Sequence, residues 1–151
     1  MSQDAPRVGI VLVSHSVRLA EGTADLAGQV SGGTVRVLAA GGTEDGGLGT
    51  SAEKVARAVA DAETGAGVLV LPDLGSAVLT VRAMLAEMGG LAEMGGPDEM
   101  GRLEDTPGAR VVLADAPFVE GAVAATVTAA AGADLKAVAT AAEEAWHARK
   151  L

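Results

Sequence analysis

Residues 8–16 read Val8-Gly9-Ile10-Val11-Leu12-Val13-Ser14-His15-Ser16, an aliphatic run that ends in three polar side chains. The part from Val8 to Val13 lacks polar alternation and is rich in β-branched residues, which is typical of a strand buried on both faces of a parallel sheet. An amphipathic segment begins directly after it. His15 therefore stands between a rigid strand and the first turn of a helix, where its side chain can reach solvent.

Three further aliphatic runs predict three more strands, at Val35–Ala39, Gly67–Leu71 and Arg110–Leu113. Helical patterns occupy residues 17–30, 51–63, 76–88, 119–131 and 134–147. This alternation predicts a single open α/β domain over residues 1–151, with a mainly parallel sheet and helices on both faces. We expect the strand order 2-1-3-4. The sequence leaves open an additional antiparallel edge strand supplied by a partner subunit.

Several local signals refine this prediction. In the first helix, Leu19, Thr23, Leu26 and Val30 recur at helical spacing and mark its apolar side. The tetrapeptide 50–53, Thr-Ser-Ala-Glu, has the form of a capping box for the second helix.

The last two helices and the connection before them carry further signals. Gly132 is expected to cap the end of the fourth helix and Asp134 the start of the fifth. Residues 85–96 repeat the hexapeptide Leu-Ala-Glu-Met-Gly-Gly, and a degenerate copy follows up to residue 101. This Gly-rich duplication predicts a lengthened surface connection after the third helix.

Composition narrows the classes of partner and site. The formal net charge of -9 disfavours nucleic acid and anionic membrane surfaces as partners. The chain has no cysteine, which excludes disulfides and thiolate metal sites, and it shows no metal-ligand spacing and no phosphate-loop fingerprint. The first apolar run is too short for a signal peptide or a membrane span. We expect a cytoplasmic protein without a metal or an organic cofactor.

His15 and Asp73 are predicted to meet at the edge of the sheet. In open α/β sheets the ligand site lies beyond the carboxyl ends of the strands, where the strand order reverses. With the order 2-1-3-4, this reversal makes neighbours of the loops after the first and third strands, which carry these two residues. An aspartate that accepts a hydrogen bond from one imidazole nitrogen leaves the other as an exposed lone pair. We therefore predict that His15 is a nucleophile oriented by Asp73.

Residues suited to an anion surround this pair in the predicted fold. Ser16 opens the first helix, Gly75 and Ser76 open the third, and Thr50 lies in a Gly-rich turn before the second. Helix N-termini attract phosphate, so a nucleophilic nitrogen among such groups predicts a transient phosphohistidine. Taken singly, a histidine after a strand or an aspartate after a proline more often has a structural role in a loop. A hydrolase is disfavoured, because Gly-x-Ser-x-Gly is absent.

Short segments spread over nearly the whole chain carry a family resemblance. They are residues 11–16 with 19–22, 41–42 with 48–51, 70–77, and 116–122. In this order and spacing they resemble DhaM, the phosphotransferase subunit of bacterial dihydroxyacetone kinases, whose N-terminal domain is similar to the mannose-type enzyme IIA domains of the sugar phosphotransferase system (PTS). The segment from Asp73 to Ala77 distinguishes DhaM from the sugar transporters.

The resemblance implies a phosphorelay. The histidine matching His15 receives a phosphoryl group from the phosphocarrier HPr and passes it to ADP bound on the subunit DhaL, which then phosphorylates dihydroxyacetone held by DhaK. The aspartate matching Asp73 orients the imidazole, so that Nε2 carries the phosphate, and Gly75 with Ser76 lines the phosphate pocket. The resemblance also implies a homodimer. Some family members continue into HPr-like and enzyme I-like domains, and residues 1–151 contain neither.

Two alternatives stay open at this point. The first is a mannose-type enzyme IIA that feeds a sugar permease, against which the segment after Asp73 weighs. The second is a regulatory module, in which the phosphorylation state of His15 controls binding to a transcription factor or a kinase without onward transfer.

Overall fold

The fold is an open α/β sheet whose strands all run parallel. The computed structural model describes residues 5–89 and 111–151. Its strands are β1 (Gly9–Ser14), β2 (Val37–Gly41), β3 (Val68–Pro72) and β4 (Val111–Leu113), in the order β2-β1-β3-β4. The predicted fold class and strand order are confirmed. Within the described residues the sheet holds no antiparallel edge strand, and the repeat from residue 90 onward lies outside them.

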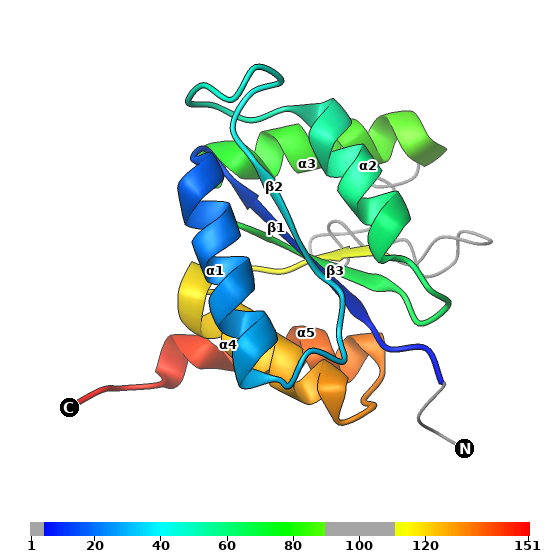
Figure 1. Ribbon diagram of the computed structural model, residues 1–151, viewed down its shortest axis with the longest axis vertical. Coiled ribbons are helices and arrows are strands. Elements are labelled where there is room, and N and C mark those ends of the chain that lie inside the picture. The colour runs from blue at the N-terminus through cyan, green and yellow to red at the C-terminus, as the bar shows by residue number, and fades with distance from the viewer. Residues whose placement is uncertain (1–4, 90–110) are drawn as a thin grey trace.

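Helices cover both faces of the sheet. The helices α1 (Val17–Val30), α4 (Phe118–Ala130) and α5 (Leu135–Glu144) pack on one face, and α2 (Ala52–Ala62) and α3 (Gly75–Gly89) pack on the other (Figure 1). A short 3₁₀ helix, η4 (Ala145–His147), follows α5. None of the helices in the described part of the chain is long and apolar enough to cross a membrane.

The central strand β1 explains why the aliphatic run lacks polar alternation. Ile10 and Leu12 point into the core beneath α1, α4 and α5, whereas Val11 and Val13 point into the core beneath α2 and α3. All four side chains are fully buried. A strand with a helical layer on each face has no solvent side, so aliphatic residues occupy every position.

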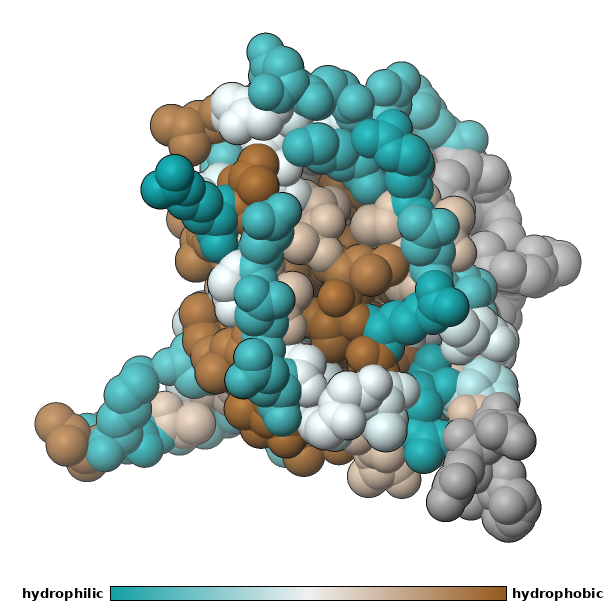
Figure 2. All heavy atoms as spheres, in the orientation of Figure 1, coloured by the Kyte–Doolittle hydropathy of each residue, from teal (hydrophilic) through white to brown (hydrophobic). Residues whose placement is uncertain are grey.

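The buried side of α1 differs from the predicted one. Its core-facing residues are Ala20, Thr23 and Ala27, whereas the other members of the predicted stripe, Leu19, Leu26 and Val30, are 43%, 46% and 54% exposed. Only Thr23 was placed correctly. Small side chains let the helix lie close to the sheet. Figure 2 shows hydrophobic side chains at the surface beside the polar residues of α1.

The caps of three helices test the local signals. The N-cap of α2 is Ser51, whose side chain accepts a hydrogen bond from the N–H of Lys54, so the capping box starting at Thr50 was wrong by one residue. Asp134 caps α5 as predicted. At the end of α4 the cap residue is Ala131, and Gly132 follows it in the left-handed region with φ of 91°, where glycine is favoured.

The strand β2 begins and ends two residues later than predicted. Its last residue, Gly41, touches the start of α1, because a Cβ atom at this position would lie 2.6 Å from the backbone oxygen of Ser16. Only glycine permits this approach without displacing one of the two segments. The close contact holds the end of β2 against the first turn of the helix that follows His15.

Candidate active site

The end of β1 lies between β2 and β3, at the reversal of strand order. The N–H of Gly42 donates to the carbonyl of Ser14 (3.0 Å), and the N–H of Asp73 donates to the carbonyl of Val13 (2.9 Å). The loops that follow all three strands are therefore tied to one another by backbone bonds. This edge of the sheet brings together His15 and Asp73, which lie 58 positions apart in the sequence.

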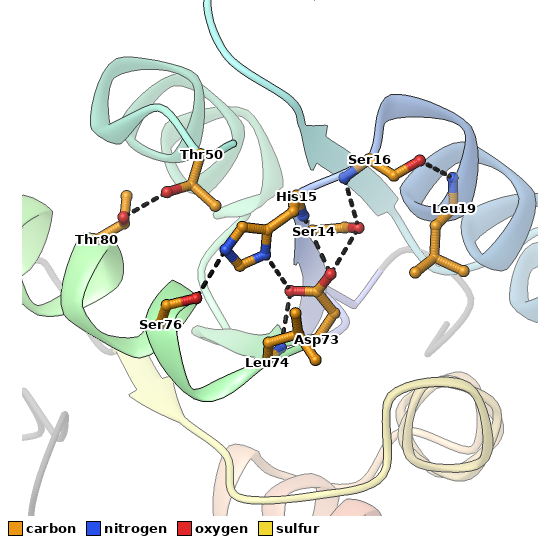
Figure 3. A network of polar contacts seen from close by, with 9 residues as sticks. All are labelled: Ser14, His15, Ser16, Leu19, Thr50, Asp73, Leu74, Ser76 and Thr80. Carbon is orange, nitrogen blue, oxygen red and sulfur yellow. Dashed lines mark hydrogen bonds and ion pairs between the residues drawn. The ribbon is translucent and has the colours of Figure 1, made fainter. Parts of the chain in front are cut away.

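The His15 imidazole contacts the Asp73 carboxylate. The distance from Nδ1 to Oδ1 is 3.0 Å, and the exposed fractions of the two side chains are 28% and 8% (Figure 3). The backbone N–H of His15 donates to the second carboxylate oxygen, Oδ2, at 3.1 Å. Asp73 thus holds both the ring and the backbone of the histidine.

Two opposing effects set the pKa of Asp73. Burial raises it, but the hydrogen bonds donated by the His15 backbone, the His15 ring and the Ser14 hydroxyl together outweigh burial and lower the pKa below its ordinary value. Asp73 is consequently a carboxylate at neutral pH, and it accepts hydrogen bonds only. The proton of the neutral imidazole must therefore be on Nδ1, which leaves the lone pair on Nε2.

Ser76 faces this lone pair. Its Oγ lies 2.8 Å from Nε2 of His15, and with the proton on Nδ1 the hydroxyl is the donor. Ser76 and Gly75 form the first turn of α3, with Gly75 as its first residue. The predicted site residues Gly75 and Ser76 thus lie beside the imidazole, at a helix N-terminus that attracts negative charge.

Ser14 is a site residue that the sequence analysis did not assign. It is fully buried at the end of β1. Its hydroxyl donates to Oδ2 of Asp73 (2.9 Å) and accepts from the N–H of Ser16 (3.0 Å). A polar residue at the end of a wholly apolar strand, next to a candidate nucleophile, is the signal that could have identified it.

The two remaining predicted phosphate ligands have their hydroxyls engaged elsewhere. Ser16 is the N-cap of α1, and its Oγ accepts from the N–H of Leu19 at 3.2 Å. Thr50 pairs with Thr80 of α3, with 2.5 Å between their Oγ1 atoms. The neighbouring Gly49 donates its N–H to the carbonyl of His15 (3.0 Å), which joins the loop after β2 to the site.

The chemistry of the site rests on this hydrogen-bonded network. In the described ranges, histidine, aspartate and glutamate side chains do not gather in a group of three that could hold a metal ion. What the residues provide is an imidazole with a fixed proton on one nitrogen and a nucleophilic lone pair on the other. A serine and a helix N-terminus lie beside that lone pair.

Comparisons with known proteins show the family to which the chain belongs. Residues 9–139 match the family model described as the PTS system fructose IIA component. The chain is 37% identical over 134 residues to the phosphoryl donor subunit DhaM of the PEP-dependent dihydroxyacetone kinase of Escherichia coli K12. This alignment covers 87% of the chain and 25% of that relative, so the chain spans about a quarter of its length.

A shorter relative and two solved structures match over most of their lengths. The DhaM subunit of dihydroxyacetone kinase 2 from Listeria innocua is 34% identical, with coverage of 80% of this chain and 84% of the relative. A crystal structure of a protein of unknown function has a TM-score of 0.69 and 30% identity, and the match covers 91% of this chain and 94% of the other.

A sigma-54 interaction domain protein from Enterococcus faecalis, with a TM-score of 0.63 and 16% identity, shares the fold; the match covers 94% of this chain and 92% of the other. The resemblance carried by the sequence motifs is thus confirmed, and the chain belongs to the PTS fructose IIA component family and, within it, to the DhaM subunits.

Proposed function

We propose that the protein is a phosphohistidine carrier of a PEP-dependent dihydroxyacetone kinase. In this proposal His15 accepts a phosphoryl group from HPr and passes it to ADP bound on DhaL, and the ATP so formed supports phosphorylation of dihydroxyacetone. The observation that carries the proposal is the imidazole held at Nδ1 by Asp73, with Nε2 facing Ser76 at the start of α3. The relatives' names, which describe phosphoryl donor subunits, support it.

The transfer can be written as two displacements at phosphorus. In the first, the lone pair of Nε2 forms a bond to the phosphoryl group as the N–P bond of phosphorylated HPr breaks. The proton stays on Nδ1, so the phosphorylated ring is cationic and the Asp73 carboxylate beside it stabilises that charge. In the second, a β-phosphate oxygen of ADP attacks the phosphorus, the Nε2–P bond breaks, and the imidazole is neutral again.

The phosphoryl oxygens would interact with the first turn of α3. When Nε2 is phosphorylated, Ser76 can no longer donate to it, and the same hydroxyl lies within reach of a phosphoryl oxygen. The N-terminus of α3 at Gly75 adds favourable electrostatics. We assign lesser roles to Ser16 and Thr50, because each must give up an existing hydrogen bond before its hydroxyl can bind phosphate.

Isotope labelling tests the carrier function. The purified protein is incubated with radioactive phosphoenolpyruvate, enzyme I and HPr, and the modified residue is mapped. We expect acid-labile label on His15, none in His15→Ala, and full labelling in His147→Ala, which removes the other histidine of the chain. Label retained in folded His15→Ala would refute the assignment.

The rival within the family is an enzyme IIA that feeds a sugar permease, which the family description itself supports. The two functions differ in the acceptor. Labelled protein is therefore mixed either with DhaL carrying ADP or with a permease IIB domain. Transfer to ADP supports the kinase role, and transfer to the IIB domain alone refutes it. Retention of the label with both acceptors would favour the regulatory module.

We also propose a cytoplasmic homodimer. The exposed apolar residues Leu26 and Val30 on α1 offer a surface that a second copy could cover. Analytical ultracentrifugation tests the dimer directly. A chain that sediments as a monomer at micromolar concentration would contradict it.

A further inference from the structure

The hydroxyls of Thr50 and Thr80 join the loop after β2 to α3 beside the candidate active site (Figure 3). Their Oγ1 atoms lie 2.5 Å apart, and both residues are half-buried. Thr80 lies one turn beyond Ser76 in α3, and residues four positions apart lie on the same face of a helix. The threonine pair therefore restrains the face of α3 that carries Ser76.

These contacts close a ring that begins and ends at His15. The carbonyl of His15 accepts a hydrogen bond from the N–H of Gly49 (3.0 Å), and Gly49 directly precedes Thr50 in the chain. Thr50 contacts Thr80, and one helical turn leads from Thr80 back to Ser76. The Ser76 hydroxyl then lies 2.8 Å from Nε2 of the same histidine. The position of Ser76 is thus fixed from two sides, by its own hydrogen bond and by the threonine pair.

The first turn of α3 has little packing of its own. Gly75 and Ser76 are exposed, and a Cβ atom on Gly75 would meet nothing within 4 Å. Core packing acts on another side of the helix, because the buried residues Ala77 and Val81 lie about 100° to 140° around the axis from Ser76. A hydrogen bond on the Ser76 side therefore restrains a turn that the core does not hold directly.

This restraint has its largest effect while Nε2 carries the phosphoryl group. In the proposed transfer the hydrogen bond between Ser76 and Nε2 breaks, whereas the contact between Thr50 and Thr80 is not part of the reaction and stays in place. It keeps the Ser76 hydroxyl close to the phosphoryl oxygens. Small displacements of a positioned catalytic group lower the rate strongly, so a supporting contact of this kind matters for transfer.

We propose that Thr80 is a positioning residue, which acts with Thr50 to hold Ser76 against the phosphoryl group on His15. This inference rests on the proposed carrier function. It replaces the phosphate contact predicted for Thr50 with a supporting role, and it adds a residue of α3 that the sequence analysis did not assign.

Nuclear magnetic resonance of the unphosphorylated protein tests the positioning without any transfer. The nitrogen chemical shift of His15 Nε2 depends on the hydrogen bond that this atom accepts. We expect Thr80→Val to move this shift toward its value in Ser76→Ala, whereas Thr80→Ser, which keeps the hydroxyl, leaves it near the wild-type value. The matched control is Thr128→Val, which removes a hydroxyl bonded to the carbonyl of Ala124 on α4 and should not move the shift.

Transfer rates test whether Thr80 acts through Ser76. At saturating phosphorylated HPr, Thr80→Val should slow phosphorylation about threefold to tenfold, the range for loss of one neutral hydrogen bond, and it should leave the KM for HPr unchanged. In the Ser76→Ala background the same substitution should slow phosphorylation no further, because both residues act on one contact. Adding Thr50→Val to Thr80→Val should likewise cause no additional loss.

An unmoved Nε2 shift in Thr80→Val overturns the proposal, as does equal slowing by Thr80→Val with and without the Ser76 hydroxyl. A wild-type protein that accepts no phosphate refutes the carrier function instead. The Nε2 shift decides in that case too whether Thr80 positions Ser76.

Discussion

The Oγ atom of Ser76 lies 2.8 Å from Nε2 of His15, which is the ring nitrogen that Asp73 does not contact. In the proposed transfer, the Ser76 hydroxyl occupies the position that the incoming phosphoryl group would take. The proposed transfer therefore requires this hydrogen bond to break each time Nε2 is phosphorylated.

Replacing Ser76 should slow phosphoryl transfer. In Ser76→Ala the hydroxyl cannot follow the phosphoryl group, and loss of a hydrogen bond to a charged group costs about 1.5 to 3 kcal/mol, or roughly tenfold to a hundredfold in rate. Ser76→Thr, which keeps a hydroxyl, should retain most of the activity. Rapid-quench measurement of single-turnover phosphorylation gives the rates. An alanine variant as fast as the wild type would show that Ser76 does not act on the phosphoryl group.

Asp73→Asn should slow transfer at least about tenfold while leaving the fold intact, because the ring loses both its fixed tautomer and the charge that stabilises its cationic form. The same quench measurement tests this. Asp25→Asn, at an exposed position on α1, is the control. Transfer at the wild-type rate would mean that Asp73 does not orient His15.

The lowered pKa of Asp73 also predicts how stability depends on pH. A carboxyl whose pKa is lower in the folded than in the unfolded state stabilises the fold above its unfolded pKa of about 4, and this contribution is lost as the pH falls through the folded value. The stability difference between wild type and Asp73→Asn should therefore shrink on acidification from pH 7. Urea unfolding at several pH values measures it.

Other carboxyl groups with lowered pKa values do not contribute to the stability difference between wild type and Asp73→Asn. The pKa values of Glu44, Asp45 and Glu120 are lowered as well, mainly by side-chain hydrogen bonds, but both proteins contain them. A difference that stays constant between pH 7 and the acid range would contradict the assignment to Asp73.

Ser14→Ala should shift the acid limb of the rate–pH profile. Without the Ser14 hydroxyl the Asp73 carboxylate loses one of the hydrogen bonds that lower its pKa, so activity should decline at a higher pH than in the wild type. The free energy of unfolding should fall by about 1 kcal/mol. Ser31→Ala, which loses a hydrogen bond to Gly28 far along α1, should affect stability alone. A profile that coincides with the wild-type curve would assign Ser14 a purely structural role.

Gly41→Ala and Gly22→Ala should have opposite effects on stability. A methyl group at Gly41 meets the backbone of Ser16 and should destabilise the fold by about 1 to 3 kcal/mol. At Gly22, in α1, a Cβ meets nothing within 4 Å, and alanine should stabilise by roughly 0.5 to 1 kcal/mol. Thermal unfolding of both variants tests the pair. Equal melting temperatures of the two variants would show that the backbone near Gly41 and Ser16 shifts to accommodate the methyl group at little cost.

The sequence predicted those features that follow from strand topology. Uninterrupted aliphatic runs mark buried parallel strands, and strand order then places His15 beside Asp73 without any knowledge of the loops. The buried side of α1 was missed because leucine is more hydrophobic than alanine, whereas close packing on the sheet selects Ala20 and Ala27 for their size. The cap at Ser51 and the role of Ser14 depend on which partner each hydroxyl faces, the N–H of Lys54 in one case and the Asp73 carboxylate in the other, and spacing alone does not encode that choice.

The bond from the Asp73 amide to the Val13 carbonyl extends the β1–β3 ladder by one residue into the site. The separation of His15 and Asp73 is consequently set by the spacing of neighbouring strands, whose backbones lie about 4.8 Å apart. Changes of chain length elsewhere leave it untouched. The far end of α3 is likewise remote from the site, because the helix separates Ser76 from residue 89 by about 20 Å. The spacing between His15 and Asp73 thus follows from the sheet alone and does not depend on how the chain continues beyond the far end of α3.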